Sequence, residues 1–552
     1  MIYSRPERPS LQGSNFDVAI IGGGINGAAI ARECAFAGRR VFLAEKADFG
    51  SGTTSRATRI IHGGLRYLEH GEIGLVRESL QERERLLKER PHLVRPLDFV
   101  LALRTHGIKR SALAIRAGIS LYRRAARSRV SISGKDLAVL ESNLDRGLNL
   151  SLFPYQDAQC EYPERLVAEW LAEAAEAGAV VRNYTPALEI LTHEGKARGL
   201  RLRDSLTNEE SEVAADWIVN AGGPWADEIL RSSALEHRQM VGGIRGSHIV
   251  LPVFAGAPRQ AVYGEAADSR TVFVIPWAAQ ILVGTTEVPQ EESPDRAEPS
   301  ALEIEYLLAA VGTLFPQSGI GAADIRYAYA GVRPLPFSPG DSLSAISRRH
   351  FLHHHLEDGV AGLITVVGGK LTTAASLARS CAAMMGVKSR EVGSTMAAIE
   401  SSAIDEVLAS WTRGVAQEGN ISRSTASAIV EWHGRRAEDV ARTAAVDEAL
   451  QRPLCAHSDH IVAEAVEAVR RESAATLADI LLRRVPVALG PCWDDECSRT
   501  AAKRIGFVLG WTEPQQRFEL ENFVEERRRF LHPASISPKT QTRESLFVEG
   551  PR

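Results

Sequence analysis

An apolar strand that leads into a glycine turn is the feature that most limits how this chain can fold. Residues 16–21 (FDVAII) precede Gly22, Gly24 and Gly27, which fit the pattern G-x-G-x-x-G, and a helix is expected to follow. The first glycine permits the tight turn, the second lets the backbone approach a pyrophosphate, and the third lets helix and strand pack closely. The helix N-terminus then favours phosphate. The pattern predicts a Rossmann-like dinucleotide-binding domain.

The segments after this helix refine the prediction. A second strand, residues 40–44, ends at Glu45, close to the spacing of about 20 residues at which an acid accepts hydrogen bonds from the adenosine ribose. A carboxylate there would repel a 2′-phosphate, which disfavours NADP. The following loop, residues 50–59, includes Thr54 and Ser55, whose hydroxyls can bind phosphate and ribitol oxygens. The turn itself does not separate FAD from NAD.

A second glycine turn lies far along the chain. The apolar residues 363–367 (LITVV) are followed by Gly368, Gly369 and Lys370, again in the order strand, glycines, helix. A helix that begins near Lys370 would direct amides and its positive dipole end at whatever lies before it. We expect the two turns to hold one flavin from two sides, with this field stabilising the anionic reduced ring.

Several motifs, taken in order, resemble those of one known family. They are IIHGGLRYLEH at 60–70, NAGGPW at 220–225, GSHIV at 246–250, FVIPW at 273–277, GTT at 284–286, GVRPL at 331–335 and GGKLTT at 368–373. Together they resemble the FAD-dependent glycerol-3-phosphate dehydrogenases, respiratory enzymes associated with membranes. The resemblance covers residues 15 to 385, and the C-terminal part is similar to the family's helical cap only loosely.

The resemblance implies an α/β fold of the glycine-oxidase type. An FAD-binding Rossmann-like domain would interleave with an antiparallel substrate domain in residues 15–395, with the substrate part at 95–160 and 240–335. A C-terminal α-helical domain would occupy 396–532, and 533–552 would be a flexible tail. The implied reaction oxidises sn-glycerol 3-phosphate to dihydroxyacetone phosphate, with FAD passing electrons to a membrane quinone.

Site residues are carried over position by position. The implied substrate site comprises Arg66, Tyr67, His248, Thr286, Arg333 and Lys370. The expected cofactor contacts are Gly22, Gly24, Asn26, Gly27, Glu45, Thr54, Ser55, Gly63, Gly64, Leu65, Ala221, Gly222, Gly369, Lys370, Leu371 and Thr372.

Elementary chemistry gives these substrate residues distinct roles. A dianionic phosphate needs fixed cations, which Arg66, Arg333 and Lys370 would supply. Oxidation of a secondary alcohol needs a base for the hydroxyl proton, and histidine has the side-chain pKa nearest neutrality, so His248 is the candidate catalytic base. Arg333 would also stabilise the developing alkoxide as a second catalytic residue.

Composition excludes other classes of function. The chain has 552 residues, a net charge of −4 and 44% hydrophobic residues, so we expect no general nucleic-acid binding. The six cysteines form no C-x-x-C pair and no familiar zinc spacing, and Cys492 and Cys497 are interpreted as packing residues on one helical stretch. The three adjacent residues His353–His355 cannot all face one ion. The sequence therefore predicts no metal site.

Location is inferred from what the sequence lacks and from one basic segment. No signal-peptide core and no run of 18 apolar residues are present, which predicts a cytoplasmic protein. Residues 107–133 contain no acid but seven bases: Lys109, Arg110, Arg116, Arg123, Arg124, Arg127 and Arg129. Its apolar residues are Leu113, Ile115, Ile119, Leu121 and Tyr122. Such a helix can lie peripherally on an anionic membrane, or pack on its own domain as a solvated helix.

Other readings stay open at this point. The same substrate could be oxidised with electrons passed to oxygen, or the substrate could be another small amino or hydroxy acid, although three cations favour phosphate. A flavin-binding sensor without turnover would not need His248, Arg333 and Lys370, all of which are present. The C-terminal helices could also form the contact of a homodimer.

Overall fold

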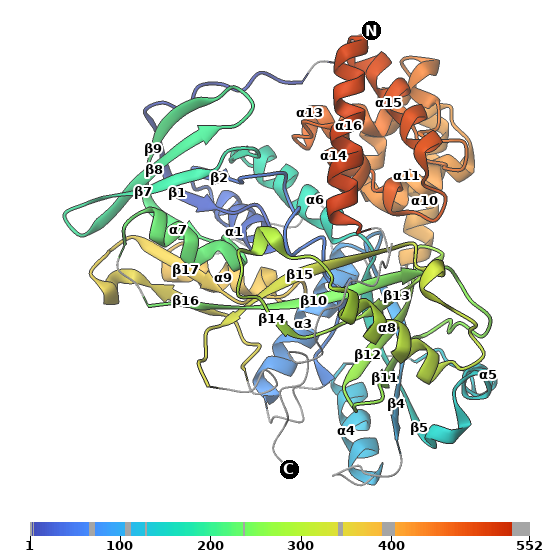
Figure 1. Cartoon of the computed structure of the whole chain (residues 1–552). Coiled ribbons are helices and arrows are strands. Elements are labelled where there is room, and N and C mark those ends of the chain that lie inside the picture. Colours follow the sequence, from blue (N-terminus) through green and yellow to red (C-terminus); the bar gives the residue numbers. More distant parts are fainter. Residues whose placement is uncertain are drawn as a thin grey trace.

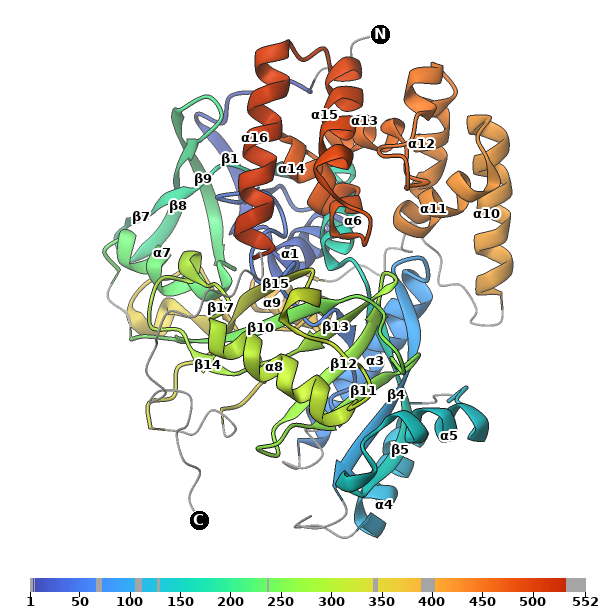
Figure 2. The same cartoon turned by 45° about the vertical axis from the view of Figure 1, so that its right-hand side comes forward.

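The computed structural model describes residues 3, 5–65, 72–104, 112–126, 130–235, 238–340, 346–388 and 403–532. Arg66 and Tyr67, the expected seam near residue 395 and the expected tail at 533–552 lie outside these residues. Two sheets and a group of C-terminal helices make up the described molecule (Figure 1). The helices are drawn in orange and red above the second sheet in the rotated view (Figure 2).

The first sheet forms the nucleotide half. Its strands run in the order β16 (Phe351–His354), β17 (Leu363–Val367), β9 (Glu209–Asn220), β1 (Ser14–Ile21), β2 (Val41–Ala44) and β6 (Val180–Arg182). From β17 to β6, each strand pairs with its neighbour in parallel. The hairpin of β7 (Ala187–His193) and β8 (Lys196–Asp204) pairs with β9 through β8. Contacts with helices α1 (Ile25–Phe36), α6 (Pro163–Glu176) and α9 (Ala374–Met384) bury apolar strands, as is typical of parallel sheets.

The second sheet is built from distant segments. Its strands run in the order β14 (Val288–Pro289), β10 (Val241–Leu251), β13 (Gln280–Gly284), β12 (Thr271–Trp277), β11 (Ala261–Glu265), β4 (Val94–Arg104), β5 (Leu150–Cys160) and β3 (Ile60–Ile61), and β15 (Tyr327–Pro336) also pairs with β10. Strands β12 and β13 form an antiparallel hairpin. The β11–β4 pair is parallel, which departs from the expected antiparallel sheet. No turn joins these two strands, so no hairpin sets their direction.

Helices pack on both faces of the second sheet. Helix α8 (Ala301–Leu314) begins with a capping box between Ser300 and Glu303 and buries Leu307, Val311 and Leu314 against the sheet. Helix α5 (Gly134–Asn143) packs on the same face as α8, and α3 (Ile73–Glu89) and α4 (Ala112–Ala125) pack on the opposite face. Helix α7 (Ala226–Ser232) packs on the first sheet. Helix α3 buries Leu75, Val76, Leu80 and Leu86, which recur at helical spacing.

The C-terminal region is helical, as predicted. It comprises α10 (Ile404–Gly419), α11 (Arg423–His433), α12 (Ala437–Ala444), α13 (Val462–Arg471), α14 (Leu477–Asp479), α15 (Asp495–Leu509) and α16 (Glu513–Phe530). The Thr512 side chain caps α16, and Pro514 lies in the first turn of this helix.

Buried ion pairs join the helical region to the nucleotide half. Arg484 donates two hydrogen bonds of 2.8 Å to Asp48, which follows β2, and Arg483 contacts the same carboxylate. Arg165 on α6 donates to both carboxylate oxygens of Glu472 at 2.6 and 2.9 Å. Because removing one partner would leave the other charge buried and unpaired, these contacts tie the helical region to the cofactor-binding half.

Candidate active site

The two glycine turns meet in the structure. The Asn26 side-chain amide, on α1, donates to the Gly368 carbonyl oxygen at 3.1 Å. Gly369 has φ +95°, and a Cβ there would lie 2.4 Å from Asn26 Nδ2. Gly22 has φ +106°, and its Cβ would lie 2.5 Å from the carbonyl oxygen of Ala221. Side chains at these positions would displace backbone or the Asn26 amide, so the close approach of the turns requires glycine.

A large cavity lies between the turns. Its volume is about 1480 Å³. Its lining includes both turns, the loop of residues 50–59 (the hydroxyl-rich loop) and one face of the second sheet. The predicted residues that line it are Gly22, Gly24, Asn26, Glu45, Thr54, Ser55, Gly64, Leu65, Ala221, Gly222, His248, Arg333, Gly369, Lys370, Leu371 and Thr372. Its size and its glycine-lined entrance fit a dinucleotide cofactor.

Glu45 and Thr54 are held by the backbone around the first turn. The Glu45 carboxylate accepts hydrogen bonds from the amides of Gly23 at 2.7 Å and Ala47 at 3.0 Å. Burial nevertheless raises the pKa of Glu45 above its ordinary value. The Thr54 hydroxyl accepts a hydrogen bond of 3.1 Å from the amide of Ile25 at the start of α1. The hydroxyl-rich loop thus orients the helix N-terminus that faces the cavity.

Two predicted cofactor residues lie behind the lining. A Cβ at Gly27 would lie 1.9 Å from the Gly22 carbonyl oxygen, so this position serves helix packing. A Cβ at Gly63 would lie 2.3 Å from a Leu80 methyl carbon. The Gly63 amide donates at 3.2 Å to Asp157, a buried residue that the sequence analysis did not single out and that also accepts from Tyr122 at 2.8 Å. Asp157 therefore anchors the loop that carries Gly64 and Leu65.

His248 lies on β10 with its ring fixed from several sides. The ring stacks on Tyr329 with centroids 4.9 Å apart, and a Cβ at Gly284 would lie 2.2 Å from His248 Cδ2. Nε2 lies 2.9 Å from the hydroxyl of Thr58, another cavity residue. Among the described residues, buried Nδ1 has no hydrogen-bond partner. Burial, reinforced by Arg333, holds the pKa of His248 well below its ordinary value of 6.5, so the imidazole is neutral near pH 7.

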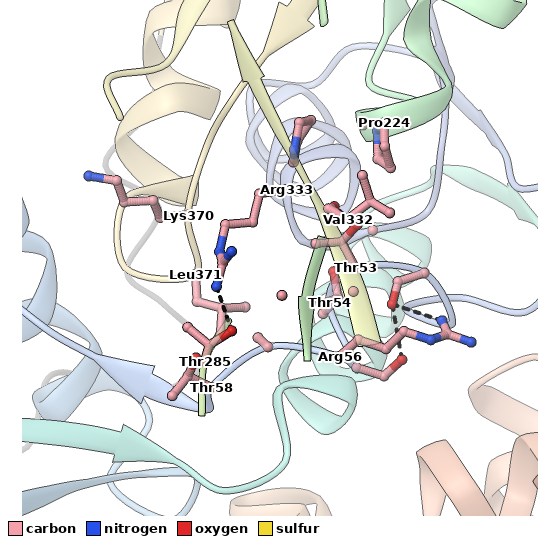
Figure 3. Close-up of a pocket in the computed structure, with 18 of the residues that line it drawn as sticks. Thr53, Thr54, Arg56, Thr58, Pro224, Thr285, Val332, Arg333, Lys370 and Leu371 are labelled. Atoms are coloured by element: carbon pink, nitrogen blue, oxygen red, sulfur yellow. Dashed lines mark hydrogen bonds between the residues drawn. The ribbon is translucent and has the colours of Figure 1, made fainter. Parts of the chain in front are cut away.

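Arg333 reaches the cavity from β15. Its guanidinium donates to the Thr285 hydroxyl at 2.8 Å, a hydrogen bond drawn as a dashed line in Figure 3. A Cβ at Gly246 would lie 2.5 Å from Arg333 Nη2, so the strand beneath the guanidinium requires glycine. The fork is thus held over Gly246, two residues before His248 on the neighbouring strand.

Thr286 is not brought to the cavity. Its hydroxyl donates to buried Glu303 at 2.6 Å and accepts from the Ser247 amide at 2.8 Å. Thr285, which the sequence analysis did not name, lines the cavity instead. The GTT motif could have suggested either threonine, because successive residues in extended backbone face opposite sides.

Lys370 lines the cavity from another direction. Figure 3 shows its side chain extending away from the Arg333 guanidinium. Burial lowers the pKa of Lys370 to about 8, with Glu72 opposing and Arg348 reinforcing the shift. Arg348 also lines the cavity and pairs with Glu287, and the sequence analysis missed it. Arg66 and Tyr67, the other two predicted substrate residues, lie outside the described residues.

Comparisons with known proteins agree with this architecture. A family model described as FAD dependent oxidoreductase matches residues 17–379. A second model, described as the C-terminal domain of alpha-glycerophosphate oxidase, matches residues 392–516. A protein from Synechocystis sp. named glycerol-3-phosphate dehydrogenase is 35% identical over 541 residues, covering 94% of this chain and 97% of that protein.

Solved structures share the fold. The glycerol-3-phosphate dehydrogenase from Bacillus halodurans complexed with FAD has a TM-score of 0.73 at 22% identity, covering 96% of this chain and 97% of its own. Glycine oxidase from Geobacillus kaustophilus has a TM-score of 0.52 at 21% identity, covering 70% of this chain and 99% of its own. The two sheets therefore form the glycine-oxidase type of fold, and the helical region is an addition to it.

Proposed function

Because this chain belongs to the family of FAD-dependent glycerol-3-phosphate dehydrogenases, we propose that it oxidises sn-glycerol 3-phosphate to dihydroxyacetone phosphate. Its cofactor is FAD, which fits the cavity between the two glycine turns. The observation that carries the proposal is the placement of neutral His248 and cationic Arg333 on adjacent strands in the wall of this same cavity.

The reaction removes a proton from oxygen and a hydride from carbon 2 of the substrate. FAD, when bound, accepts the hydride equivalent. His248 takes the hydroxyl proton, because its lowered pKa leaves the ring unprotonated at neutral pH. Arg333, held by Thr285, places a fixed positive charge where the oxygen becomes negative. Proton and hydride together account for the two hydrogens that the alcohol loses.

Arg333 and Lys370 are also the proposed partners of the phosphate. A guanidinium offers a planar fork to phosphate oxygens, and an ammonium offers a compact charge. Burial has lowered the pKa of Lys370 to about 8, and a bound dianion would raise it again by favouring the charged form. Substrate binding and protonation of Lys370 would thus reinforce each other. Arg66 and Tyr67 remain proposed contacts from the family resemblance, whereas Thr286 is held away from the cavity by Glu303.

For the electron acceptor we propose a membrane quinone, reached by peripheral contact of α4 with an anionic bilayer. Arg116, Arg123 and Arg124 are exposed on α4, and Leu121 is 64% exposed. Ile119 and Tyr122, two of the apolar residues of this segment, are buried against the second sheet, so this part of the helix packs on its own domain. Within the described ranges, no helix has the length and apolar character needed to cross a bilayer.

The test is anaerobic reduction of the bound flavin. Mixing the FAD-loaded protein with sn-glycerol 3-phosphate should bleach the visible flavin band rapidly, and glycerol or a small hydroxy acid at equal concentration should not. A quinone analogue should restore the colour faster than air does. A yellow protein that glycerol 3-phosphate leaves unbleached would refute the substrate assignment.

The same experiment tests a second candidate, an oxidase that passes electrons to oxygen. The observation that supports the oxidase is the match of residues 392–516 to a model described as the C-terminal domain of alpha-glycerophosphate oxidase. Rapid recolouring by oxygen with formation of hydrogen peroxide, and slow recolouring by quinone, would replace the dehydrogenase proposal by the oxidase.

A further inference from the structure

Four side chains with metal-binding atoms converge in the helical region, apart from the cavity. They are Cys455, His457, Cys492 and Cys497, and their ligand atoms all lie within 4.8 Å of one another. Cys497 Sγ lies 3.9 Å from His457 Nδ1. None of the four lines the cavity described above. We propose that these residues bind one structural zinc ion in tetrahedral coordination.

The distances suit this ion. Zinc lies about 2.3 Å from cysteine sulfur and about 2.0 Å from histidine nitrogen, so tetrahedral ligands are separated by roughly 3.5–3.8 Å. The group here is only slightly wider, with every pair within 4.8 Å. Three cysteines and one histidine are a typical ligand set for a closed structural site, which leaves no position for a reacting water.

Local structure places the ligands in two pairs. The chain reverses between Leu454 and His460, where the Leu454 amide donates to the His460 carbonyl oxygen at 2.8 Å. This turn carries Cys455 and His457. The second pair flanks the start of α15, where the Asp494 carboxylate accepts from the Cys497 amide at 2.7 Å.

The start of α15 fixes one of the ligands. Cys497 lies in the first turn of this helix, and the capping side chain of Asp494 accepts a hydrogen bond from its amide. The ion would fasten the turn at residues 453–461 to this helix.

A second convergent group differs from the cysteine group in the contacts that hold it together. His353, His355 and Asp358 also lie together, but Asp358 contacts His353 Nε2 at 2.6 Å and His355 Nδ1 at 2.8 Å. These charge-assisted contacts explain that group without a metal. Thiols are weak hydrogen-bonding groups, so three of them gathered around one imidazole gain little from one another.

The spacing of the ligands explains why the sequence predicted no metal. The pairs are separated by one residue in Cys455–His457 and by four in Cys492–Cys497, which matches no familiar zinc pattern. Only the fold brings the two pairs together. The predicted packing role of Cys492 and Cys497 and the proposed metal role are separable by experiment.

The first experiment measures metal in the full-length, FAD-loaded protein purified without chelator. We expect about one zinc per chain, because all four ligands belong to one chain. Cys492→Ser and Cys497→Ser should each lose nearly all of this zinc. Cys34→Ser and Cys381→Ser, at buried cysteines of the nucleotide half, should keep it. Retained FAD reports that each variant is folded.

A second measurement uses the wild-type chain alone, so it does not depend on variants that fail to fold. After removal of metal under reducing conditions, added Co²⁺ should give the intense absorption of tetrahedral thiolate-bound cobalt at wavelengths beyond the flavin bands. A reduced protein with neither zinc nor a cobalt spectrum would overturn the proposal, as would a disulfide within this group in the native protein. Neither readout depends on glycerol 3-phosphate.

Discussion

At the scale of single residues, His248 carries the most specific claim. Replacing it by Asn keeps a partner for Thr58 but removes the base, so flavin reduction by glycerol 3-phosphate should slow by about 10²- to 10⁴-fold. Because burial and Arg333 lower the pKa of His248, the wild-type ring stays unprotonated well below pH 6.5 and the rate should persist there. Anaerobic stopped-flow reduction across a pH series measures both effects.

The control for this histidine is an exposed one. His193→Asn, at the end of β7, should leave the reduction rate and its pH dependence unchanged. A His248→Asn protein that retains FAD and is reduced within a few-fold of the wild-type rate would remove His248 as the base.

Arg333 tests phosphate recognition at the same scale. Arg333→Lys keeps the charge but loses the fork that donates to Thr285, and Arg333→Ala loses both. A charged hydrogen bond contributes about 1.5–3 kcal/mol, so Arg333→Ala should raise the apparent KM by at least tenfold, with a smaller increase in Arg333→Lys. Steady-state kinetics with a quinone analogue measures this. Unchanged kinetics in both variants would exclude Arg333 from the site.

At the scale of elements, the contact between the two glycine turns should control FAD affinity. Gly369→Ala places a Cβ 2.4 Å from Asn26 Nδ2 at φ +95°, so the Asn26 amide must shift and its hydrogen bond to Gly368 is disturbed. The left-handed backbone alone costs about 1–2 kcal/mol, and the displaced Asn26 adds to it, so FAD should bind at least tenfold more weakly. Gly386→Ala is the matched control, since Gly386 has φ +69° but no atom within 4 Å of its Cβ.

Titration of apo-protein with FAD, followed by flavin fluorescence, distinguishes the two effects. If Gly386→Ala weakened FAD binding as much as Gly369→Ala, general destabilisation would explain the result and the contact of the turns would not.

Helix α4 is the element that tests membrane contact. Each base near an anionic surface contributes about 1 kcal/mol, so Arg123→Gln combined with Arg124→Gln should weaken binding to phosphatidylserine-containing vesicles roughly 30-fold. Arg413→Gln with Arg423→Gln, at exposed positions of α10 and α11, should leave binding unchanged. Vesicle co-sedimentation measures this. Equal binding of wild type to neutral vesicles would contradict an electrostatic contact.

The elements also show what the sequence could and could not predict. Strand β1, its glycine turn and helix α3 were predictable because their patterns are local. The choice between Thr285 and Thr286 was not, because Glu303 on α8 takes the Thr286 hydroxyl. The roles of Asp157 and of the cysteine group were not predictable either, because their partners lie in segments distant in the chain. Most of the predicted cofactor residues line the cavity, while packing decided which of their neighbours face it.

At the scale of the whole molecule, the helical region is coupled to the cofactor through Asp48. This carboxylate follows β2 and the cavity residue Glu45, and it accepts hydrogen bonds from Arg484 at 2.8 Å. Asp48→Asn leaves Arg483 and Arg484 buried with less compensation, which costs about 3 kcal/mol. Glu210→Gln, in an exposed pair with Arg203, should cost at most about 1 kcal/mol. Thermal unfolding with FAD release as the readout compares them.

The contact of Asp48 with Arg483 and Arg484 also predicts how the free energy of unfolding responds to acid. Burial alone would raise the pKa of Asp48, but Arg484 and Arg483 lower it to about 2 from 3.8. The unfolded chain therefore takes up the proton first as pH falls, and the contribution of Asp48, about 2 kcal/mol, is complete above pH 3.8 and lost toward pH 2. The difference in unfolding temperature between wild type and Asp48→Asn should shrink over this interval. A difference that stayed constant with pH would mean that the ionised carboxylate does not hold the two parts together.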